Sequence, residues 1–297
     1  MSWDLDFISE EDFTEHVEST LQNYFKNLKA FDVARFNKNS IDPVKMVFDH
    51  ALGGLEWKDI VSAEIMRQRD KTINNQIGYF HQNIFKYMCD CIVPPNGKSG
   101  GWDVIYSPQG NPYKIDRSNS VGKIYVEVKN KHNTMNAASS TSTYEKMTRQ
   151  IFNDDDSACF LVEIIAKKSQ NIVWEPRVRG KKTSNRRIRR VSIDKFYEIV
   201  TGEEDAFYRL CMKLPATIEK VLATSDELDP PEDTVFDELE KLAEKSKAPA
   251  GVDPMVAAMF SLGFSHYNGF AESNDNIKHV PNISASSNPS ITANKQE

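Results

Sequence analysis

The segment from Lys123 to Asn130 constrains the fold most, because its hydrophobicity alternates with a period of two residues. Successive side chains of a β-strand point to opposite faces of a sheet, so this period predicts a strand with one buried face. The buried face would carry Ile124, Val126 and Val128. The other face would carry Tyr125, Glu127 and Lys129. The strand therefore presents a carboxylate and an ammonium group together.

A second acidic residue, Asp103, lies in a short apolar run from Trp102 to Tyr106. Glycines precede this run and a Ser-Pro pair follows it, which is typical of a strand bounded by turns. A hairpin that pairs the two strands would bring Asp103 beside Glu127. Carboxylates bind Mg²⁺, and a lysine can orient or deprotonate a water that attacks a phosphate. The alternative is a solvated strand face where Glu127 and Lys129 form a surface ion pair.

A polar segment without acids follows this strand, from Asn130 to Asn136 and on to Thr143. Its lysine, asparagine, serine and threonine side chains are common donors to phosphate oxygens, and asparagine also reads adenine edges. Its position at the mouth of the predicted site favours substrate contact over a plain polar loop. The candidate DNA-binding residues here are Lys131, His132, Asn133 and Asn136.

A basic segment lies further along the chain and contains eight basic residues and no acid. These residues are Arg177, Arg179, Lys181, Lys182, Arg186, Arg187, Arg189 and Arg190. Removing them from the net charge of −6 leaves −14 on the rest of the chain, so the positive field is concentrated in one place. Arginine also favours bidentate contact with phosphate or guanine. Apolar residues flank the segment, which favours an anchored DNA-binding hairpin over a solvated loop or a targeting peptide.

The composition excludes several other classes of protein. A chain of 297 residues with 39% hydrophobic content can bury one large core or two modest ones. No stretch approaches the ~18 apolar residues that span a membrane, and the acidic N-terminus does not read as a secretory signal. Cys89 and Cys91 have no second pair at zinc spacing, and the histidines are scattered. We therefore expect reduced thiols and no zinc centre.

The remaining periodicities predict an α/β core with additional helices on both sides. Helices are expected over 9–29, 43–53, 59–91 with a break around 71–75, 144–152, 192–201, 206–220 and 236–247. A buried central strand is expected over 159–165, where only Glu163 interrupts an apolar run. From about Glu272 the chain is rich in Asn and Ser, which predicts a disordered tail.

The constellation of Asp103, Glu127 and Lys129 resembles the catalytic core of the PD-(D/E)XK nucleases, although Trp102 stands where a proline often precedes the first acid. Over about 60–225 the chain looks like bacterial type II restriction endonucleases, and most like the group that cleaves GGNCC-like sites. The segments that carry this likeness are 71–82, 101–103, 127–136 and 194–202. The resemblance implies an α/β fold with a mixed central sheet flanked by helices. It also implies Mg²⁺-dependent cleavage of both strands of a short DNA palindrome, leaving 5′-phosphates.

The same resemblance assigns roles to individual residues. Asp103, Glu127 and the carbonyl of Val128 would hold Mg²⁺, Lys129 would position the attacking water, and Gln76 would be contributed by the preceding helix. Gln82 is a further candidate on that helix, but either amide could simply belong to the helix surface. A palindromic target implies a homodimer on double-stranded DNA. A restriction enzyme also implies a cognate DNA methyltransferase in the bacterial host and a place in the cytoplasm.

The expected organisation has four regions. Residues 1–58 form a helical region packed on the core, and 59–225 form the nuclease core with the basic segment at 174–191. Residues 226–271 form a C-terminal helical region, and 272–297 form the tail. Three other functions remain open: a structure-specific or repair nuclease with the same core, a DNA-binding module without catalysis, and a protein–protein adaptor with a basic docking loop.

Overall fold

The computed structural model describes residues 3–95, 99–224, 232–246 and 248–267. The chain divides into two compact units. The first, here called the sheet unit, comprises Met1–Asn27 and Lys71–Asp229. The second, the helical unit, comprises Leu28–Asp70 and Pro230–Glu297. The expected tail over 272–297 lies outside the described residues.

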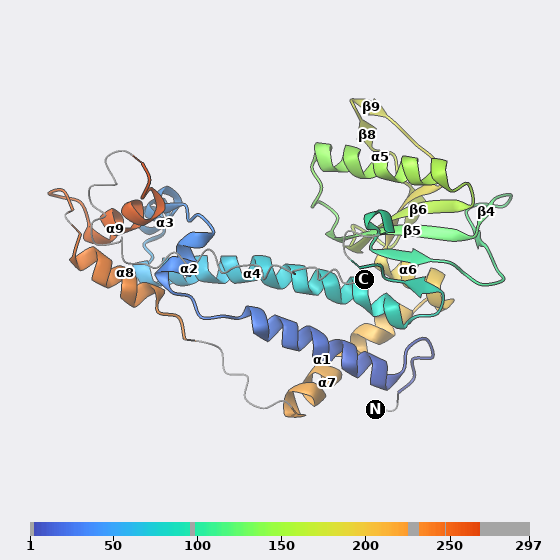
Figure 1. Ribbon diagram of the computed structural model, residues 1–297, viewed down its shortest axis with the longest axis horizontal. Coiled ribbons are helices and arrows are strands. Elements are labelled where there is room, and N and C mark those ends of the chain that lie inside the picture. Colours follow the sequence, from blue (N-terminus) through green and yellow to red (C-terminus); the bar gives the residue numbers. More distant parts are fainter. Residues whose placement is uncertain (1–2, 96–98, 225–231, 247, 268–297) are drawn as a thin grey trace, which may run out of the picture. The chain divides into compact units, whose positions relative to one another are not determined.

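A mixed sheet forms the centre of the sheet unit (Figure 1). Among the described residues it has six strands, in the spatial order β1-β2-β5-β6-β10-β7. The β5–β6 and β6–β10 pairs are parallel, whereas the β1–β2, β2–β5 and β10–β7 pairs are antiparallel. The strands are β1 (Cys91–Ile92), β2 (Val104–Tyr106), β5 (Lys123–Lys131), β6 (Ser157–Ile165), β7 (Asn171–Val173) and β10 (Ile188–Ser192). The predicted α/β core with a mixed central sheet is confirmed.

Helices cover both faces of this sheet, as Figure 1 shows for α5 on one side and α6 on the other. Helix α5 (Ala137–Asn153) packs on the face that carries Tyr125 and Leu161. The opposite face carries the larger apolar cluster, to which Ile124, Val126 and Phe160 contribute. Helices α1 (Glu10–Asn27), α6 (Ile193–Thr201) and α7 (Ala206–Thr224) and the end of α4 cover that face. Strand β6 is almost entirely buried because both of its faces are covered, whereas in β5 only Ile124 and Val126 are fully buried.

Helix α4 (Trp57–Asn83) is continuous, so the predicted break at residues 71–75 is wrong. That stretch is polar but contains neither proline nor glycine, and nothing in it prevents helical backbone geometry. The Asn130 side chain also donates to the Asn74 carbonyl at 3.0 Å, which gives the polar turn a partner. The stretch marks the point where the helical unit ends and the sheet unit begins. A short 3₁₀ turn, η1 (Ile84–Tyr87), follows the helix.

The helical unit brings together parts of the chain that are far apart in the sequence. It comprises α2 (Val33–Lys38), α3 (Pro43–Gly53), the first part of α4, α8 (Val235–Glu244) and α9 (Pro254–Gly263). Phe36, Val61, Leu239 and Met259 are among its buried core residues. The sequence-based ranges differ from this division, because residues 28–58 cluster with the C-terminal helices and only the first helix belongs with the sheet. The helical unit therefore has its own core.

Candidate active site

Asp103 is held at the start of β2 by the neighbouring strand β5. The two strands pair antiparallel with Val104 opposite Val126, and this register places Asp103 alongside Glu127. The Asp103 amide donates to the Val126 carbonyl at 3.0 Å, and its Oδ2 accepts from the Val128 amide at 2.7 Å. The predicted antiparallel pairing of the two strands is thus confirmed, and Asp103 is held through both its backbone and its side chain.

Glu127 has an ammonium group on each carboxylate oxygen. Lys129 Nζ donates to Oε1 at 2.8 Å, and Lys146 Nζ donates to Oε2 at 2.7 Å. Only 15% of the Glu127 side chain is exposed, so these contacts lie in a partly desolvated setting. The alternation in β5 predicted the Lys129 contact. The Lys146 contact was missed, because this lysine comes from α5 and no linear motif links it to the strand.

The environments shift the pKa values of the two acids in opposite directions. Burial raises the pKa of Asp103, and the amide of Val128 offsets only part of that effect. Burial alone would also raise the pKa of Glu127, yet hydrogen bonds and charge from Lys129 and Lys146 hold it below its usual value. Glu127 is therefore the more readily ionised of the two.

Helix α5 also holds the chain just before the first acid. Lys146 Nζ donates to the Gly101 carbonyl at 2.6 Å and lies 4.1 Å above the centre of the Trp102 ring. One turn further along α5, Gln150 accepts from Trp102 Nε1 at 3.1 Å. Trp102 is buried, and it anchors the backbone next to Asp103. Only the helical spacing of Lys146 and Gln150 could have indicated from the sequence that they act on one face.

A second buried group of charges lies at the end of the same sheet face. Glu163 on β6 is opposite Lys129 in the parallel register and is only 1% exposed. Its carboxylate is 3.1 Å from His132 Nδ1 and is also paired with Arg190. Arg190 donates to the His132 carbonyl at 2.9 Å as well. The sequence showed Glu163 only as an interruption in an apolar run, yet it fixes the start of the polar segment after β5.

Three of the candidate residues in the polar segment, Lys131, Asn133 and Asn136, are exposed. Lys131 and Asn133 project from the end of β5 and the turn after it. Asn136 caps α5, because its side-chain oxygen accepts from the Ser139 amide at 2.9 Å. These three side chains are therefore accessible to solvent.

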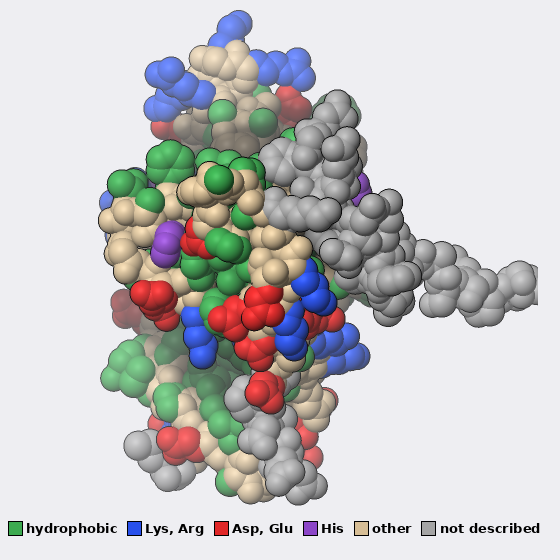
Figure 2. Space-filling model, turned by 90° about the vertical axis from the view of Figure 1, so that its left-hand side faces the viewer, with side chains coloured by type: hydrophobic (Ala, Val, Ile, Leu, Met, Phe, Trp, Pro, Cys, Tyr) green, Lys and Arg blue, Asp and Glu red, His purple; other side chains and the backbone are tan. Residues whose placement is uncertain are grey.

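The basic segment folds as an anchored hairpin, as predicted. Strands β8 (Arg177–Val178) and β9 (Lys181–Lys182) pair antiparallel around a turn at Arg179 and Gly180. Both turn residues have positive φ, 49° and 82°, which is the geometry of tight hairpin turns. Arg177, Arg179, Lys181 and Lys182 are exposed. Lys and Arg side chains gather at this hairpin at the top of Figure 2.

The arginines after the hairpin mostly bind the protein itself. Arg187 donates to the carbonyls of Asp155 and Ser157, and Arg189 donates to the Asn171 carbonyl. Arg186 is exposed and forms only a 3.5 Å ion pair with Asp116. The basic segment therefore has two parts. The hairpin residues are exposed, whereas Arg187 and Arg189 donate hydrogen bonds to the backbone of neighbouring strands.

Both candidate glutamines lie near the end of α4, the helix before the first acid. Gln82 is buried and its Nε2 donates to the Asp103 carbonyl at 3.3 Å. Gln76 is half-buried one and a half turns earlier. A Cβ added at Gly78 would lie 3.4 Å from the Asn130 side chain, so α4 runs close to the end of β5. The helix thus borders the site, as the sequence predicted.

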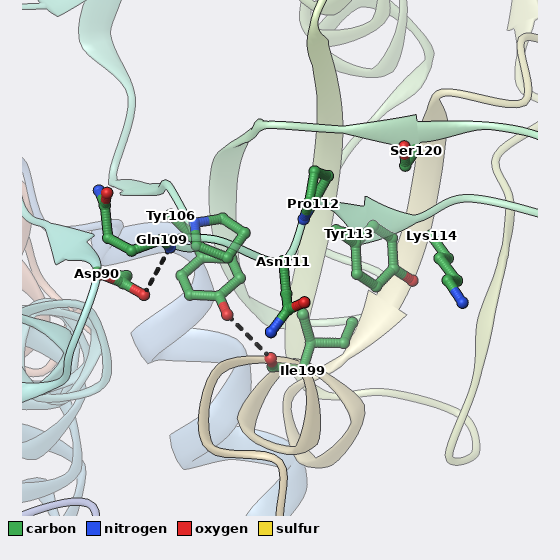
Figure 3. A pocket seen from close by; sticks show the side chains of 10 residues that line it. Asp90, Tyr106, Gln109, Asn111, Pro112, Tyr113, Lys114, Ser120 and Ile199 are labelled. Atoms are coloured by element: carbon green, nitrogen blue, oxygen red, sulfur yellow. Dashed lines mark hydrogen bonds between the residues drawn. The ribbon is translucent and has the colours of Figure 1, made fainter.

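A hollow of about 720 Å³ lies away from the carboxylates (Figure 3). Tyr106, Tyr113 and Lys114 line it, and the Tyr106 hydroxyl donates to the Ile199 carbonyl at 3.3 Å. Tyr106 belongs to the sheet face opposite Glu127. Neither Asp103 nor Glu127 is among the residues that line this hollow.

Within the described part of the chain, no three or more His, Cys, Asp or Glu residues gather as a metal-binding group. A divalent ion here would have two carboxylates as its acidic ligands and would need further oxygen ligands from backbone or water. Mg²⁺ accepts that arrangement, because it usually keeps several waters.

No described helix is long and apolar enough to cross a membrane.

A mixed sheet flanked by helices, with an Asp, a Glu and a Lys on one face, is consistent with the fold of the PD-(D/E)XK nucleases. The family model described as Eco47II restriction endonuclease matches residues 5–223. The chain belongs to this family, and it is a type II restriction endonuclease, an enzyme that hydrolyses DNA at specific sites as part of a restriction–modification system. Enzymes of this kind generally need divalent metal ions.

Two curated relatives support this assignment. The chain is 35% identical to the type II restriction enzyme Sau96I of Staphylococcus aureus over 228 residues, which is 74% of this chain and 82% of the relative. It is 31% identical to the type II restriction enzyme Eco47II of Escherichia coli over 228 residues, or 74% of this chain and 88% of the relative. The match to this chain thus covers most of the length of each relative.

Proposed function

We propose that the enzyme cleaves both strands of a short GGNCC-like palindrome by Mg²⁺-dependent hydrolysis, with Asp103, Glu127 and Lys129 as its catalytic residues. The observation that carries this proposal is the shared sheet face, where Asp103 lies alongside Glu127 and Lys129 contacts Glu127 at 2.8 Å. The GGNCC specificity rests on the resemblance of residues 71–82, 101–103, 127–136 and 194–202 to that group of enzymes.

The residues at the site form a suitable set of ligands for Mg²⁺. Asp103 and Glu127 would hold the ion together with the carbonyl of Val128. The N–H and C=O of a strand residue point to the same side of the strand, and the Val128 N–H points to Asp103. Its carbonyl is therefore directed to the same side as that carboxylate. When bound, the ion supplies Lewis acidity toward the phosphate and lowers the pKa of a bound water.

The protein groups orient the reactants in this proposal. Lys129 carries a positive charge beside Glu127, where it can hold the attacking water and stabilise the charge that develops on the phosphate. The Val128 amide fixes the Asp103 carboxylate at 2.7 Å, so that group needs no rearrangement to act. Gln76, on the helix that borders the site, is a candidate contact to the substrate.

The basic and polar segments are proposed to bind double-stranded DNA. Lys131, His132, Asn133 and Asn136 lie at the end of β5 and the start of α5, next to the carboxylates. The proposed contacts from the basic segment are Arg177, Arg179, Lys181, Lys182 and Arg186, and the sequence also favoured Arg187 and Arg189. The exposed hairpin residues suit contact with phosphates or guanines, whereas Arg187 and Arg189 support the strands from which those contacts are made.

A palindromic target has two-fold symmetry, so we infer a homodimer with one active site for each strand. A cognate DNA methyltransferase in the host would protect the same sites, and the enzyme would act in the bacterial cytoplasm. Sedimentation with a duplex that contains one site tests the stoichiometry, and two copies per duplex are expected.

Digestion of a sequenced plasmid with Mg²⁺, followed by mapping of the fragment ends, tests the whole proposal. Discrete fragments whose 5′-phosphate ends fall at GGNCC-like sites are expected, and Glu127→Gln should leave the plasmid intact. Discrete ends at another sequence would overturn the specificity alone. Nicking that depends on DNA structure would favour a repair-type nuclease with the same core.

A further inference from the structure

Glu127 has no free carboxylate oxygen for an incoming ion, because an ammonium group lies on each of its two oxygens. Lys129 contacts Oε1 at 2.8 Å and Lys146 contacts Oε2 at 2.7 Å. The three side chains are 15–31% exposed, so water screens these contacts only in part. Any ion that takes a Glu127 oxygen as a ligand therefore comes into contact with an ammonium group, and repulsion between the two cations favours displacement of one of the two lysines.

The two lysines differ in how they are held. Lys129 lies two positions from Glu127 on the same strand, so its Cα cannot move away without disrupting the sheet. Lys146 arrives from α5 and has two other favourable partners, the Gly101 carbonyl at 2.6 Å and the face of Trp102 at 4.1 Å. Lys146 can give up the carboxylate and still keep hydrogen-bonding and cation–π contacts.

Charge balance favours the same exchange. With both acids ionised, Asp103 and Glu127 carry two negative charges and the two lysines carry two positive charges. A divalent ion would bring the group to a net charge of +2 in a partly buried place, which is unfavourable. Withdrawal of one ammonium group reduces that excess positive charge. Lys146 is the lysine that has alternative partners, the Gly101 carbonyl and the Trp102 ring.

We propose that Lys146 is a positioning residue that occupies Glu127 in the metal-free enzyme and gives way to the divalent ion. This role rests on the proposed function of the site. Lys146 holds the carboxylate in place and prevents it from repelling Asp103 before the ion binds. Its contacts with Gly101 and Trp102 link the same lysine to the backbone that carries Asp103.

Calorimetric titration of the full-length, DNA-free enzyme with Ca²⁺ tests this exchange without relying on activity. Lys146→Met removes the charge and keeps the apolar stem, so Ca²⁺ should bind on the order of tenfold more tightly than to the wild type. Lys146→Arg keeps the charge and should bind Ca²⁺ like the wild type. Unchanged or weaker binding by Lys146→Met would overturn the proposal.

Lys123→Met is the matched control, because Lys123 is an exposed lysine on the same strand face, four positions from Glu127. It removes the same charge at a distance where salt screens the interaction, so Ca²⁺ affinity should not change. Tighter binding by this variant to the same degree would show a general charge effect and overturn the specific role of Lys146.

A measurement on the wild-type chain avoids any folding defect of the variants. Labelling of lysines with an N-hydroxysuccinimide ester, read by mass spectrometry, should show Lys146 several-fold more reactive with saturating Ca²⁺ than without it. Equal reactivity would overturn the exchange. Failure of the proposed function is distinguishable, because Glu127→Gln would then bind Ca²⁺ like the wild type and the plasmid would remain uncut.

Discussion

Asp103 and Glu127 lie side by side but meet different electrostatic surroundings. Burial dominates at Asp103 and raises its pKa, whereas two lysines outweigh burial at Glu127 and lower its pKa. The alternation in residues 123–130 was enough to predict Glu127 and Lys129 on one face, and the glycines around Trp102 placed Asp103 on the next strand. Lys146 and Glu163 could not be predicted, because their contacts depend on how α5 and β6 pack on that strand.

The raised pKa of Asp103 predicts a trade-off between stability and activity. A carboxylate with a raised folded-state pKa destabilises the fold above that pKa, since the folded protein resists its ionisation. Asp103→Asn removes this charge and keeps an oxygen for the Val128 amide. The metal-free variant should unfold at a temperature a few degrees higher, while cleavage falls by roughly three orders of magnitude or more.

Thermal unfolding followed by circular dichroism and single-turnover plasmid cleavage, both at pH 7.5, check this prediction. Glu127→Gln is the comparison. Because the pKa of Glu127 is lowered, its ionised form stabilises the fold, so this variant should be less stable than the wild type. Substantial cleavage by Asp103→Asn would remove Asp103 from the catalytic set.

Among the elements, the strands were easier to predict than the helix boundaries. A short apolar run bounded by turn residues indicated β2, alternating hydrophobicity indicated β5, and a continuous apolar run indicated β6. Helix α4 runs through a polar stretch that looked like a break, and the division between the two units falls in this stretch without interrupting the helix. The two-residue turn of the β8–β9 hairpin agrees with the anchored hairpin expected for the basic segment.

The division of the basic segment predicts two kinds of variant. Replacing Arg177, Lys181 and Lys182 with Gln removes exposed charge from the hairpin, so DNA affinity should fall and its log–log salt slope should flatten by ~1 to 3 units. Arg187→Gln removes donors to two carbonyls at the start of β6, so the main effect should be a loss of about 1–3 kcal/mol of stability.

Fluorescence anisotropy with a labelled duplex and Ca²⁺, repeated between 50 and 300 mM salt (roughly the range where phosphate contacts dominate), measures the slope. Lys241→Gln on α8 is the matched control, because Lys241 is an exposed lysine of the helical unit. A triple variant with the wild-type slope would place the hairpin away from the DNA.

At the scale of the whole molecule, each unit has its own core, and the two are built in different ways. The centre of the sheet, β2, β5 and β6, could be predicted from local patterns, because each of these strands has an apolar pattern of its own. The helical unit joins residues 28–70 to residues after 230, with Asp233 accepting hydrogen bonds from Phe31 and Arg69. Periodicity is a local signal and carries no information about such distant pairing, so the sequence placed these helices in separate regions.

Acid should weaken the sheet unit through His16, where α1 packs on the end of α4. Its ring is buried and lies 2.9 Å from the Phe80 carbonyl, and burial lowers the pKa of His16 to about 4. The unfolded chain takes up the proton near pH 6.5, so the free energy of unfolding should fall between about pH 6.5 and pH 4 by up to about 3 kcal/mol. Burial lowers the pKa of His81 in the same direction.

His16→Gln keeps an N–H donor for the Phe80 carbonyl but cannot take up a proton in this range. Urea unfolding of both proteins at pH 7.5 and pH 5 should show a smaller loss of stability on acidification in the variant. At pH 7.5 the two should differ little, because His16 is neutral in both the folded and the unfolded chain there. An equal loss at pH 5 would mean that His16 takes up its proton in the folded state, which would require the contact between α1 and α4 to open before the rest of the sheet unit unfolds.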